Sequence, residues 1–290
     1  MNPQPGADDD GPSIRAFIVT VPSDDVDVAS DRLWQLGVRA IEERPGSGGA
    51  VELRTSVGRE DVTVARAAAT LEPTWSWRTE EVSTVSAETW RDFAGPNWIT
   101  DTLVIVPAWL DLDVDESVTC VSIEPAGAFG LGDHPTSQLS ARALERALAG
   151  RVAESSDEIS VLDVGCGTGV LSIVAALSGA RSVRAVDISA EAVAATQANA
   201  SLNGVVSVIE VDDTLVSDVD GTFDVVVANI LAPVLIASAA DLRRLTAPAG
   251  RLIISGILSD AHDHVVEALR PMIVVEVEEL EHWAAVTFRH

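Results

Sequence analysis

The chain of 290 residues is 47% hydrophobic and 22% charged, an ordinary globular composition, and its length favours two domains over one. All 19 cationic residues are arginine, and 45 acidic residues bring the formal net charge to −26, so direct nucleic-acid binding is not expected. The acidic residues are spread along the chain, which fits either an acidic proteome or a basic partner and selects neither.

The N-terminal stretch is polar, with Pro, Gly and an Asp run, and predicts a disordered tail at 1–13. It lacks the basic and apolar regions of a signal peptide. Because no apolar run approaches the ~18 residues that span a bilayer, we expect a cytoplasmic protein without membrane contact. The two cysteines, Cys120 and Cys166, are isolated from one another, so neither a disulfide framework nor a metal site is expected.

Residues 14–85 predict a small α/β domain in the order β-α-β-β-α-β. The expected strands cover 14–22, 38–44, 50–55 and 74–82, and the expected helices lie at 23–36 and 58–72. This order matches the ferredoxin-like split unit. Residues 86–117 follow as an interdomain linker, whose aromatic side chains indicate that it packs against a domain.

Residues 118–290 predict a Rossmann-like domain, in which apolar strands alternate with helices from Ile159 onward. Continuous apolar strands in such an alternation favour a parallel sheet with helices on both faces. Seven strands are expected, at 159–165, 182–188, 206–211, 223–230, 250–258, 272–280 and 283–289. No helix separates the last two, so the sheet is expected to end in an antiparallel pair.

The segment LDVGCGTG, 162–169, lies where the first of these strands turns into a helix. Gly165 and Gly167 belong to a G-x-G-x-G pattern, and glycine there permits unusual backbone angles and a close approach of a ligand to the main chain. The pattern indicates a nucleotide-type cofactor but leaves its identity open.

Asp187 ends the second strand, where a carboxylate can accept hydrogen bonds from both hydroxyls of a ribose. An acid at this place serves S-adenosylmethionine and NAD alike, and it could instead mark the start of a helix. Asp163 is more selective, because a pyrophosphate disfavours a nearby carboxylate. It could accept from the amino group of a methionine moiety or hold the shape of the loop. With the G-x-G-x-G spacing and the antiparallel ending, it favours S-adenosylmethionine.

Asn229 ends the fourth strand in VVVANILAPVL, so it is expected to face the pocket at the carboxyl edge of the sheet. Its amide and the adjacent backbone carbonyls can accept hydrogen bonds from an amine and orient its lone pair. The alternative is that Asn229 caps the following helix.

The motifs AFGLGDHPTS, LDVGCGTGVLSI, AVDI, VVANILA and LIISGIL, in this order, resemble the ribosomal protein L11 methyltransferase family, PrmA-like enzymes. The resemblance implies a substrate-recognition domain at the N-terminus and S-adenosylmethionine-dependent methylation of lysine ε-amines and the N-terminal α-amine of ribosomal protein L11. It implies cofactor contacts at Ser137, Gly165, Asp187 and Asn229. The family loop resembles A-F-G-T-G-x-H-x-T-T, so Leu131 and Ser137 depart from it, although Ser137 keeps the hydroxyl.

The loop ahead of the glycine motif is interpreted through three side chains. Phe129 is expected to cover or stack beside the cofactor. His134 is expected to hydrogen-bond within the loop rather than act as a general base. Cys166 is expected to be a small buried filler.

Three other functions stay open from the sequence. The chain could methylate another protein or a small molecule. It could be a binding or assembly factor that keeps only cofactor affinity, although the intact Asp187, Asn229 and glycines argue against this. It could be an NAD oxidoreductase, for which no catalytic acid or base stands out beyond the strands.

Overall fold

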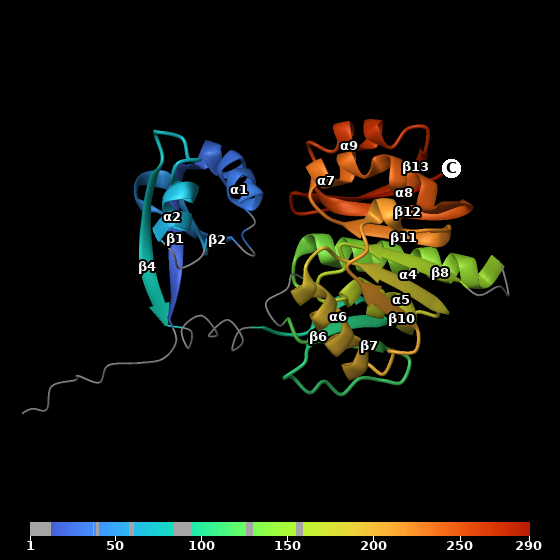
Figure 1. The fold of residues 1–290 in the computed structure, drawn as a ribbon. Helices are drawn as coiled ribbons and strands as arrows, with labels where there is room; N and C mark the ends of the chain where they lie inside the picture. Colours follow the sequence, from blue (N-terminus) through green and yellow to red (C-terminus); the bar gives the residue numbers. More distant parts are fainter. Residues whose placement is uncertain are drawn as a thin grey trace, which may run out of the picture. The chain divides into compact units, whose positions relative to one another are not determined.

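The computed structural model describes residues 13–36, 38, 41–57, 61–83, 94–125, 130–154 and 159–290. The chain divides into two compact units, Met1–Ala94 and Gly95–His290, which are treated separately (Figure 1). The boundary falls inside the segment that was predicted as a linker. Of the predicted tail, 1–12 lie outside the described residues. In the part of the chain that is described, no helix combines the length and apolarity that crossing a bilayer requires.

The first unit is one antiparallel sheet with its strands in the order β2-β3-β1-β4. Its strands are β1 (Ser13–Pro22), β2 (Glu42–Pro45), β3 (Ala50–Thr55) and β4 (Ser76–Ser83), and its helices are α1 (Val26–Gln35) and α2 (Asp61–Ala68). This order confirms the ferredoxin-like prediction. Strand β2 begins at Glu42, later than the expected start at 38, and Val38 instead belongs to the core of this unit.

The two faces of this sheet differ in chemistry. Phe17, Val19 and Leu53 alternate onto the helix side and form its core with buried residues of α1 and α2. On the other side, Ile18 lies between Arg54 and Arg78, which pair with Glu80 and Glu52. These exposed ion pairs contribute little stability. They give each of the two arginines that flank Ile18 a carboxylate partner, and Ile18 itself is fully buried.

The second unit is built on a seven-stranded sheet of order β10-β9-β8-β11-β12-β14-β13. The strands are β8 (Ser160–Val164), β9 (Ser182–Val186), β10 (Ile209–Asp212), β11 (Phe223–Asn229), β12 (Thr246–Leu258), β13 (Ile273–Leu280) and β14 (Trp283–Arg289). The first five run parallel, and β14 is antiparallel to both β12 and β13. The predicted sheet and its antiparallel ending are confirmed.

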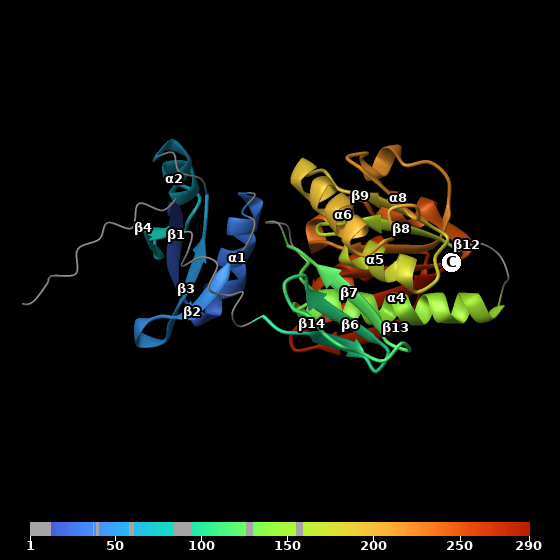
Figure 2. The same ribbon diagram turned by 90° about the horizontal axis from the view of Figure 1, so that it is seen from below.

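Helices cover both faces of this sheet (Figures 1 and 2). The helices are α4 (Pro135–Glu154), α5 (Val170–Leu177), α6 (Ala190–Leu202), α7 (Ala232–Ala237), α8 (Ala239–Leu245) and α9 (Asp263–Ala268). The first three form one layer and the last three form the other. The single helix expected at 232–245 is two helices, because the chain breaks at Ser238, which caps one and starts the next. Apolar residues of β11 and β12, including Val226 and Ile254, are fully buried between the layers.

A third, three-stranded sheet was not predicted. It consists of β5 (Asn97–Thr100), β6 (Leu103–Pro107) and β7 (Thr119–Ile123). The expected linker at 86–117 therefore contains two strands of the second unit, while 84–93 lie outside the described residues. The apolar run LVIVP could have indicated β6 in the sequence, and all five of its residues are buried in the structure.

Asn199 in α6 and Asn203, which follows the last residue of α6, hold β7 and the segment after it in place. Asn203 accepts from the Ser122 N–H at 2.9 Å and donates to the Ser122 carbonyl at 2.7 Å. Asn199 pairs in the same way with both backbone groups of Glu124, each at 2.9 Å. Each amide thus replaces a neighbouring strand, and together they fix the path of the chain just before the loop that leads to α4.

Candidate active site

The parallel strands β8, β9 and β11 end at one edge of the sheet, and the predicted site residues follow those ends. The glycine loop follows β8, Asp187 follows β9, and Asn229 is the last residue of β11. Because β8 lies between β9 and β11, the loop stands between Asp187 and Asn229. The structure therefore brings together three elements that are far apart in the sequence.

The glycine loop is a tight turn whose backbone excludes side chains. Gly165 has φ +75° and donates to the Val186 carbonyl at 2.8 Å. A Cβ on Gly165 would lie 2.4 Å from Cγ2 of Ile230. Gly169, at φ +81°, precedes α5, and a Cβ there would lie 2.8 Å from the Thr196 side chain. Glycine is therefore required both by the backbone angles and by the close packing.

Asp187 holds this loop through its carboxylate. Its Oδ2 accepts from the Gly167 N–H at 3.0 Å, and its Oδ1 accepts from the Ser189 N–H at 2.9 Å. Ser189, rather than Asp187, caps α6, because its Oγ accepts from the Ala192 N–H. Each Asp187 oxygen keeps a further lone pair, so the fixed carboxylate suits a pair of ribose hydroxyls.

Asp163 is buried beneath the loop, with 1% of its surface exposed. Its Oδ2 accepts from the Ser172 Oγ at 2.6 Å, which ties the end of β8 to α5. Burial raises the pKa of this carboxyl to about 6, and the nearby Asp187 charge acts in the same direction. Of its two predicted roles, the contact with Ser172 supports that of holding the loop.

Ser137 lies in the first turn of α4 and is 1% exposed. Its buried Oγ has no hydrogen-bond partner among the described residues. Buried hydroxyls are normally paired, so this atom suits a ligand group that would complete it. Phe129, the expected cofactor cover, lies outside the described residues.

Asn229 is half-buried at the end of β11 and lies beside Ser255 of β12. It does not cap the next helix, because α7 begins after Leu231 and has no side-chain cap. The chain around it is tightly packed: Gly256, at φ +84°, passes so close that a Cβ would lie 2.5 Å from the Ile230 carbonyl oxygen. The capping alternative is therefore not supported.

Three side chains that the sequence did not single out support the loop. The Thr168 hydroxyl donates to the Gly130 carbonyl at 2.7 Å. Thr196 donates to the Gly167 carbonyl at 3.1 Å, and Asn199 donates to the Thr168 carbonyl at 2.9 Å. The last two belong to α6, where buried polar residues three positions apart were the available signal.

Two further predictions are tested by contacts in this region. His134 hydrogen-bonds locally as expected, because its Nδ1 accepts from the Thr136 N–H at 3.3 Å and contacts the Thr136 Oγ1 at 2.8 Å. Cys166 is a buried filler: burial raises the pKa of its thiol, so it stays protonated. No group of His, Cys, Asp or Glu within the described ranges could hold a metal ion.

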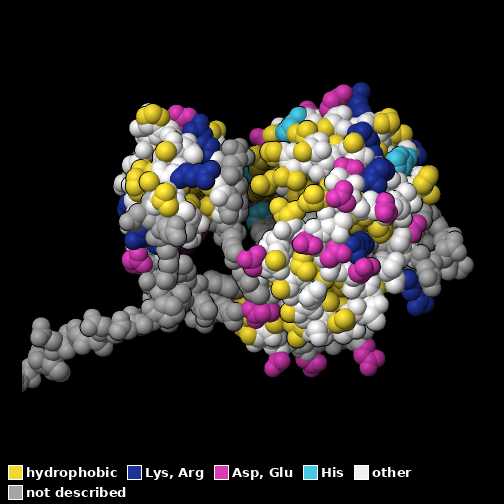
Figure 3. Space-filling view, in the orientation of Figure 1, with side chains coloured by type: hydrophobic (Ala, Val, Ile, Leu, Met, Phe, Trp, Pro, Cys, Tyr) yellow, Lys and Arg dark blue, Asp and Glu magenta, His cyan; other side chains and the backbone are white. Residues whose placement is uncertain are grey.

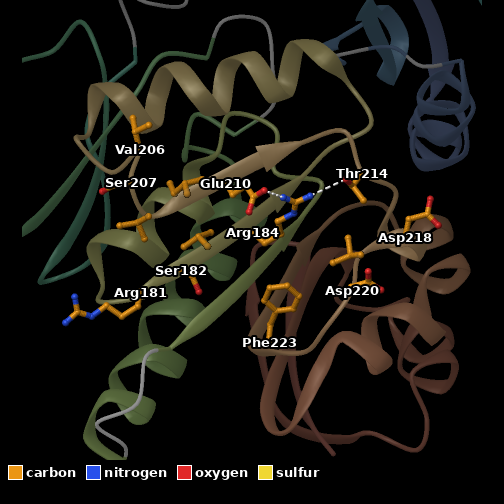
Figure 4. Close-up of a pocket in the computed structure, with 14 residues that line it drawn as sticks. Arg181, Ser182, Arg184, Val206, Ser207, Glu210, Thr214, Asp218, Asp220 and Phe223 are labelled. Carbon is orange, nitrogen blue, oxygen red and sulfur yellow. Dashed lines mark hydrogen bonds and ion pairs between the residues drawn. The ribbon is translucent and has the colours of Figure 1, made fainter.

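A cavity of about 790 Å³ lies away from this edge, where β9, β10 and β11 begin (Figure 4). Arg184 lies within it and is engaged by Glu210, at 2.6 Å, and by Asp212 and Thr214. Ligands of doubly wound sheets bind at the carboxyl ends of the strands. The cavity therefore lies at the opposite end of the strands from the expected cofactor site. Arg184 serves to join β9 to β10.

The strand order, the glycine loop after β8 and the acid after β9 define a class I methyltransferase, whose cofactor is S-adenosylmethionine. The residues present fit that cofactor: Asp187 suits the ribose, the loop allows a close approach, and Ser137 offers a hydroxyl that no described residue engages.

The family model "Ribosomal protein L11 methyltransferase (PrmA)" matches residues 59–290, and the chain belongs to this family. It is 36% identical to the ribosomal protein L11 methyltransferase of Geotalea uraniireducens over 70% of this chain and 67% of the relative. For that of Citrifermentans bemidjiense the identity is 41%, over 70% and 66%. The chain thus matches about two thirds of the length of these relatives.

A solved structure leads to the same family. The crystal structure of ribosomal protein L11 methylase from Lactobacillus delbrueckii subsp. bulgaricus superimposes with a TM-score of 0.61 at 34% identity, covering 68% of this chain and 100% of that one.

Proposed function

We propose that this protein transfers methyl groups from S-adenosylmethionine to amino groups of ribosomal protein L11, namely lysine ε-amines and the N-terminal α-amine. The names of its relatives support this substrate. The observation that carries the proposal is the placement of Asn229 on the strand next to the glycine loop that Asp187 holds. This placement puts the side-chain amide of Asn229, a hydrogen-bond acceptor, beside the loop that is proposed to bind the cofactor.

In this proposal the chain binds and orients both reactants. Asp187 receives the ribose hydroxyls, and the backbone of Gly165 and Gly167 borders the cofactor. Ser137 contacts the methionine end through the hydroxyl that is otherwise unpaired among the described residues. S-adenosylmethionine supplies the electrophilic methyl group on its sulfonium. The chain contributes mainly proximity and alignment, which are large terms in such reactions.

Asn229 would direct the incoming amine. Its carbonyl oxygen and the adjacent backbone carbonyls accept the amine's hydrogens, so the nitrogen lone pair points at the methyl group. A lysine amine has a pKa near ~10.4 and must first lose a proton. Apolar surroundings favour the neutral form. Leu231, Val234 and Ile236, 38–48% exposed, supply such surroundings on and beside α7, where hydrophobic atoms gather in Figure 3.

Substrate selection is assigned to the ferredoxin-like unit. Relatives of one fold and chemistry differ in their added domains, and this unit is the added one. The net charge of −26 suits a basic substrate, and acidic side chains are scattered over the face drawn in Figure 3. We place the reaction in the cytoplasm, where such a substrate is made.

The test is methyl transfer to purified ribosomal protein L11. The full-length protein is incubated with S-adenosylmethionine and the substrate, and intact mass and peptide masses are measured. Mass increments of one methyl on amino groups are expected, and they should appear about 100-fold more slowly with Asn229→Ala. Binding of S-adenosylmethionine without any increment would reject ribosomal protein L11 as the substrate and favour another protein or a small molecule.

A further inference from the structure

Two aromatic side chains meet beside the candidate site. The rings of His134 and Trp283 lie edge to face, with 5.0 Å between centroids and 66° between planes. His134 directly precedes α4, and Trp283 is the first residue of β14. Both are half-buried. Neither the glycine loop nor the contacts of Asp187 involve this pair.

The pair lies at the same edge of the sheet as Asn229. Asn229 lies beside Ser255 on β12, and the Ser255 Oγ donates at 2.8 Å to the carbonyl of Ala284, the residue after Trp283. On the α4 side, Ser137 follows His134 by three residues and carries the buried hydroxyl assigned to the cofactor, which has no partner in the described part of the chain. The aromatic pair therefore joins the cofactor helix to a strand two places from Asn229.

The charges around the pair favour a cation. The carboxylates of Asp133 and Glu281 are near enough to act on the His134 imidazole, and both side chains are exposed. Burial outweighs them and lowers the pKa of His134, so the ring is neutral at pH 7 and does not repel a positive charge. The N–H of Thr136 donates to Nδ1, which leaves the proton of the neutral ring on Nε2.

We propose that Trp283, with His134 beside it, forms an aromatic wall that binds the substrate amine while it is still an ammonium cation, or once it is methylated. The ligand class is an alkylammonium, such as a lysine side chain. The face of a tryptophan attracts such cations, and nearby carboxylates strengthen the attraction. This inference rests on the proposed function and gives these two residues a positioning role. They hold the amine near Asn229 without entering the reaction.

A tryptophan that served only to pack the start of β14 would not distinguish charged from neutral ligands. The test therefore compares Nα-acetyl-lysine and Nα-acetyl-Nε-trimethyllysine with Nα-acetyl-norleucine, which has the aliphatic stem without a positive charge. Calorimetry is performed on the full-length protein saturated with S-adenosylhomocysteine. Both cations should bind, and the norleucine derivative should not. Equal binding of the norleucine derivative, or no binding of either cation, would overturn the inference.

The variants are Trp283→Leu and Trp283→Phe, with Trp98→Leu as the matched control, because Trp98 is an exposed tryptophan on β5. Trp283→Leu should weaken cation binding about 3- to 30-fold, and Trp283→Phe should weaken it less. The control should leave it unchanged, and all three variants should bind S-adenosylmethionine as the parent does. If Trp283→Leu fails to fold, the Phe variant decides, because its ring keeps the packing with a weaker cation site.

Methyl transfer separates this inference from the proposed function. With ribosomal protein L11, Trp283→Leu should raise KM and lower kcat little; an unchanged KM would overturn the inference while the function stands. If ribosomal protein L11 is not methylated at all, the proposed substrate fails. Cation binding that still depends on Trp283 would then support the aromatic wall for a different amine.

Discussion

The Oδ2 of Asp187 accepts a hydrogen bond from the Gly167 N–H at 3.0 Å, across the gap between the ends of β9 and β8. The residue expected to bind the ribose therefore also fixes the loop that borders the cofactor. Because Oδ1 is held by the Ser189 N–H as well, the carboxylate is oriented before any ligand arrives. Such preorganisation lowers the cost of ordering the site on binding.

Asp187→Ala should therefore weaken S-adenosylmethionine binding about 10- to 100-fold, since charge-assisted hydrogen bonds are lost. It should also lower the thermal midpoint, because the Gly167 N–H loses its acceptor. Asp187→Asn keeps one oxygen for the loop and should restore part of the stability but little of the affinity. Calorimetry and thermal unfolding measure both effects, with the exposed Asp213→Ala as control. Unchanged donor affinity in Asp187→Ala would remove the basis of the site assignment.

Ser137→Ala should separate ligand binding from stability. Its Oγ has no partner among the described residues, so removing it should leave the free energy of unfolding within about 0.5 kcal/mol. S-adenosylmethionine affinity should fall about tenfold. Thr168→Val is the contrasting variant: its hydroxyl bonds the Gly130 carbonyl, so stability should drop by about 1 kcal/mol. A destabilised Ser137→Ala with normal affinity would show that the hydroxyl is structural.

Asn229→Ala should reduce kcat about 100-fold, because the amine loses the acceptor that aligns it. Single-turnover methyl transfer measures this directly, with donor affinity followed in parallel. Asn203→Ala is the control: it removes bonds to both backbone groups of Ser122, so it should lower stability but not the rate of the folded enzyme. Equal rate losses in the two variants would mean that Asn229 acts only through folding.

The places of three proposed site residues were predictable from the sequence because each lies where an apolar strand ends, and such runs are visible in a sequence. Gly165, Asp187 and Asn229 follow buried strands, so the parallel order alone places them on one edge. The topology was equally accessible, since the missing helix between β13 and β14 indicates the antiparallel ending. A sequence pattern shows where apolar residues recur with the spacing of a strand or a helix and where that spacing ends.

The residues that were missed depend on contacts between distant segments. Asn199 and Thr196 occupy unremarkable places in a helix, and only the packing of α6 turns them toward the loop. The contact of His134 with Trp283 joins the two ends of the domain, which no local pattern reports. The sequence predicts a linker where the structure has β5 and β6, because these strands are short and a polar stretch separates them from β7.

Asp163 predicts a dependence of stability on pH. Its folded pKa of about 6 lies above the ordinary aspartate pKa of 3.8, so between these values the folded protein binds more protons than the unfolded chain. The contribution of Asp163 to stability therefore falls as pH rises through this window, and the loss is complete above pH 6. Asp163→Asn should thus gain on the parent by about 3 kcal/mol between pH 4 and pH 7. Urea unfolding at several pH values measures this; parallel curves would contradict the raised pKa.

Alanine substitutions at four glycines separate two contributions to the free energy of unfolding, the strain of a positive φ and the clash of a new Cβ with its neighbours. Gly204 and Gly221 have φ of +69° and +86° with open space around them, so alanine there should cost only the strain, about 1 kcal/mol. Gly165→Ala adds a clash with the Ile230 side chain, and Gly256→Ala adds a clash with the Ile230 backbone. Both should cost more than the open-site variants.

The second substitution Ile230→Ala then distinguishes the two crowded sites. It removes the Cγ2 that a Cβ on Gly165 would meet at 2.4 Å, so it should rescue Gly165→Ala down to the cost of strain. It leaves the Ile230 carbonyl oxygen 2.5 Å from a Cβ on Gly256, so Gly256→Ala should not be rescued. A double-mutant cycle on the free energy of unfolding measures the coupling. Equal coupling at both glycines would show that the two clashes are relieved by a backbone shift rather than by the side chain.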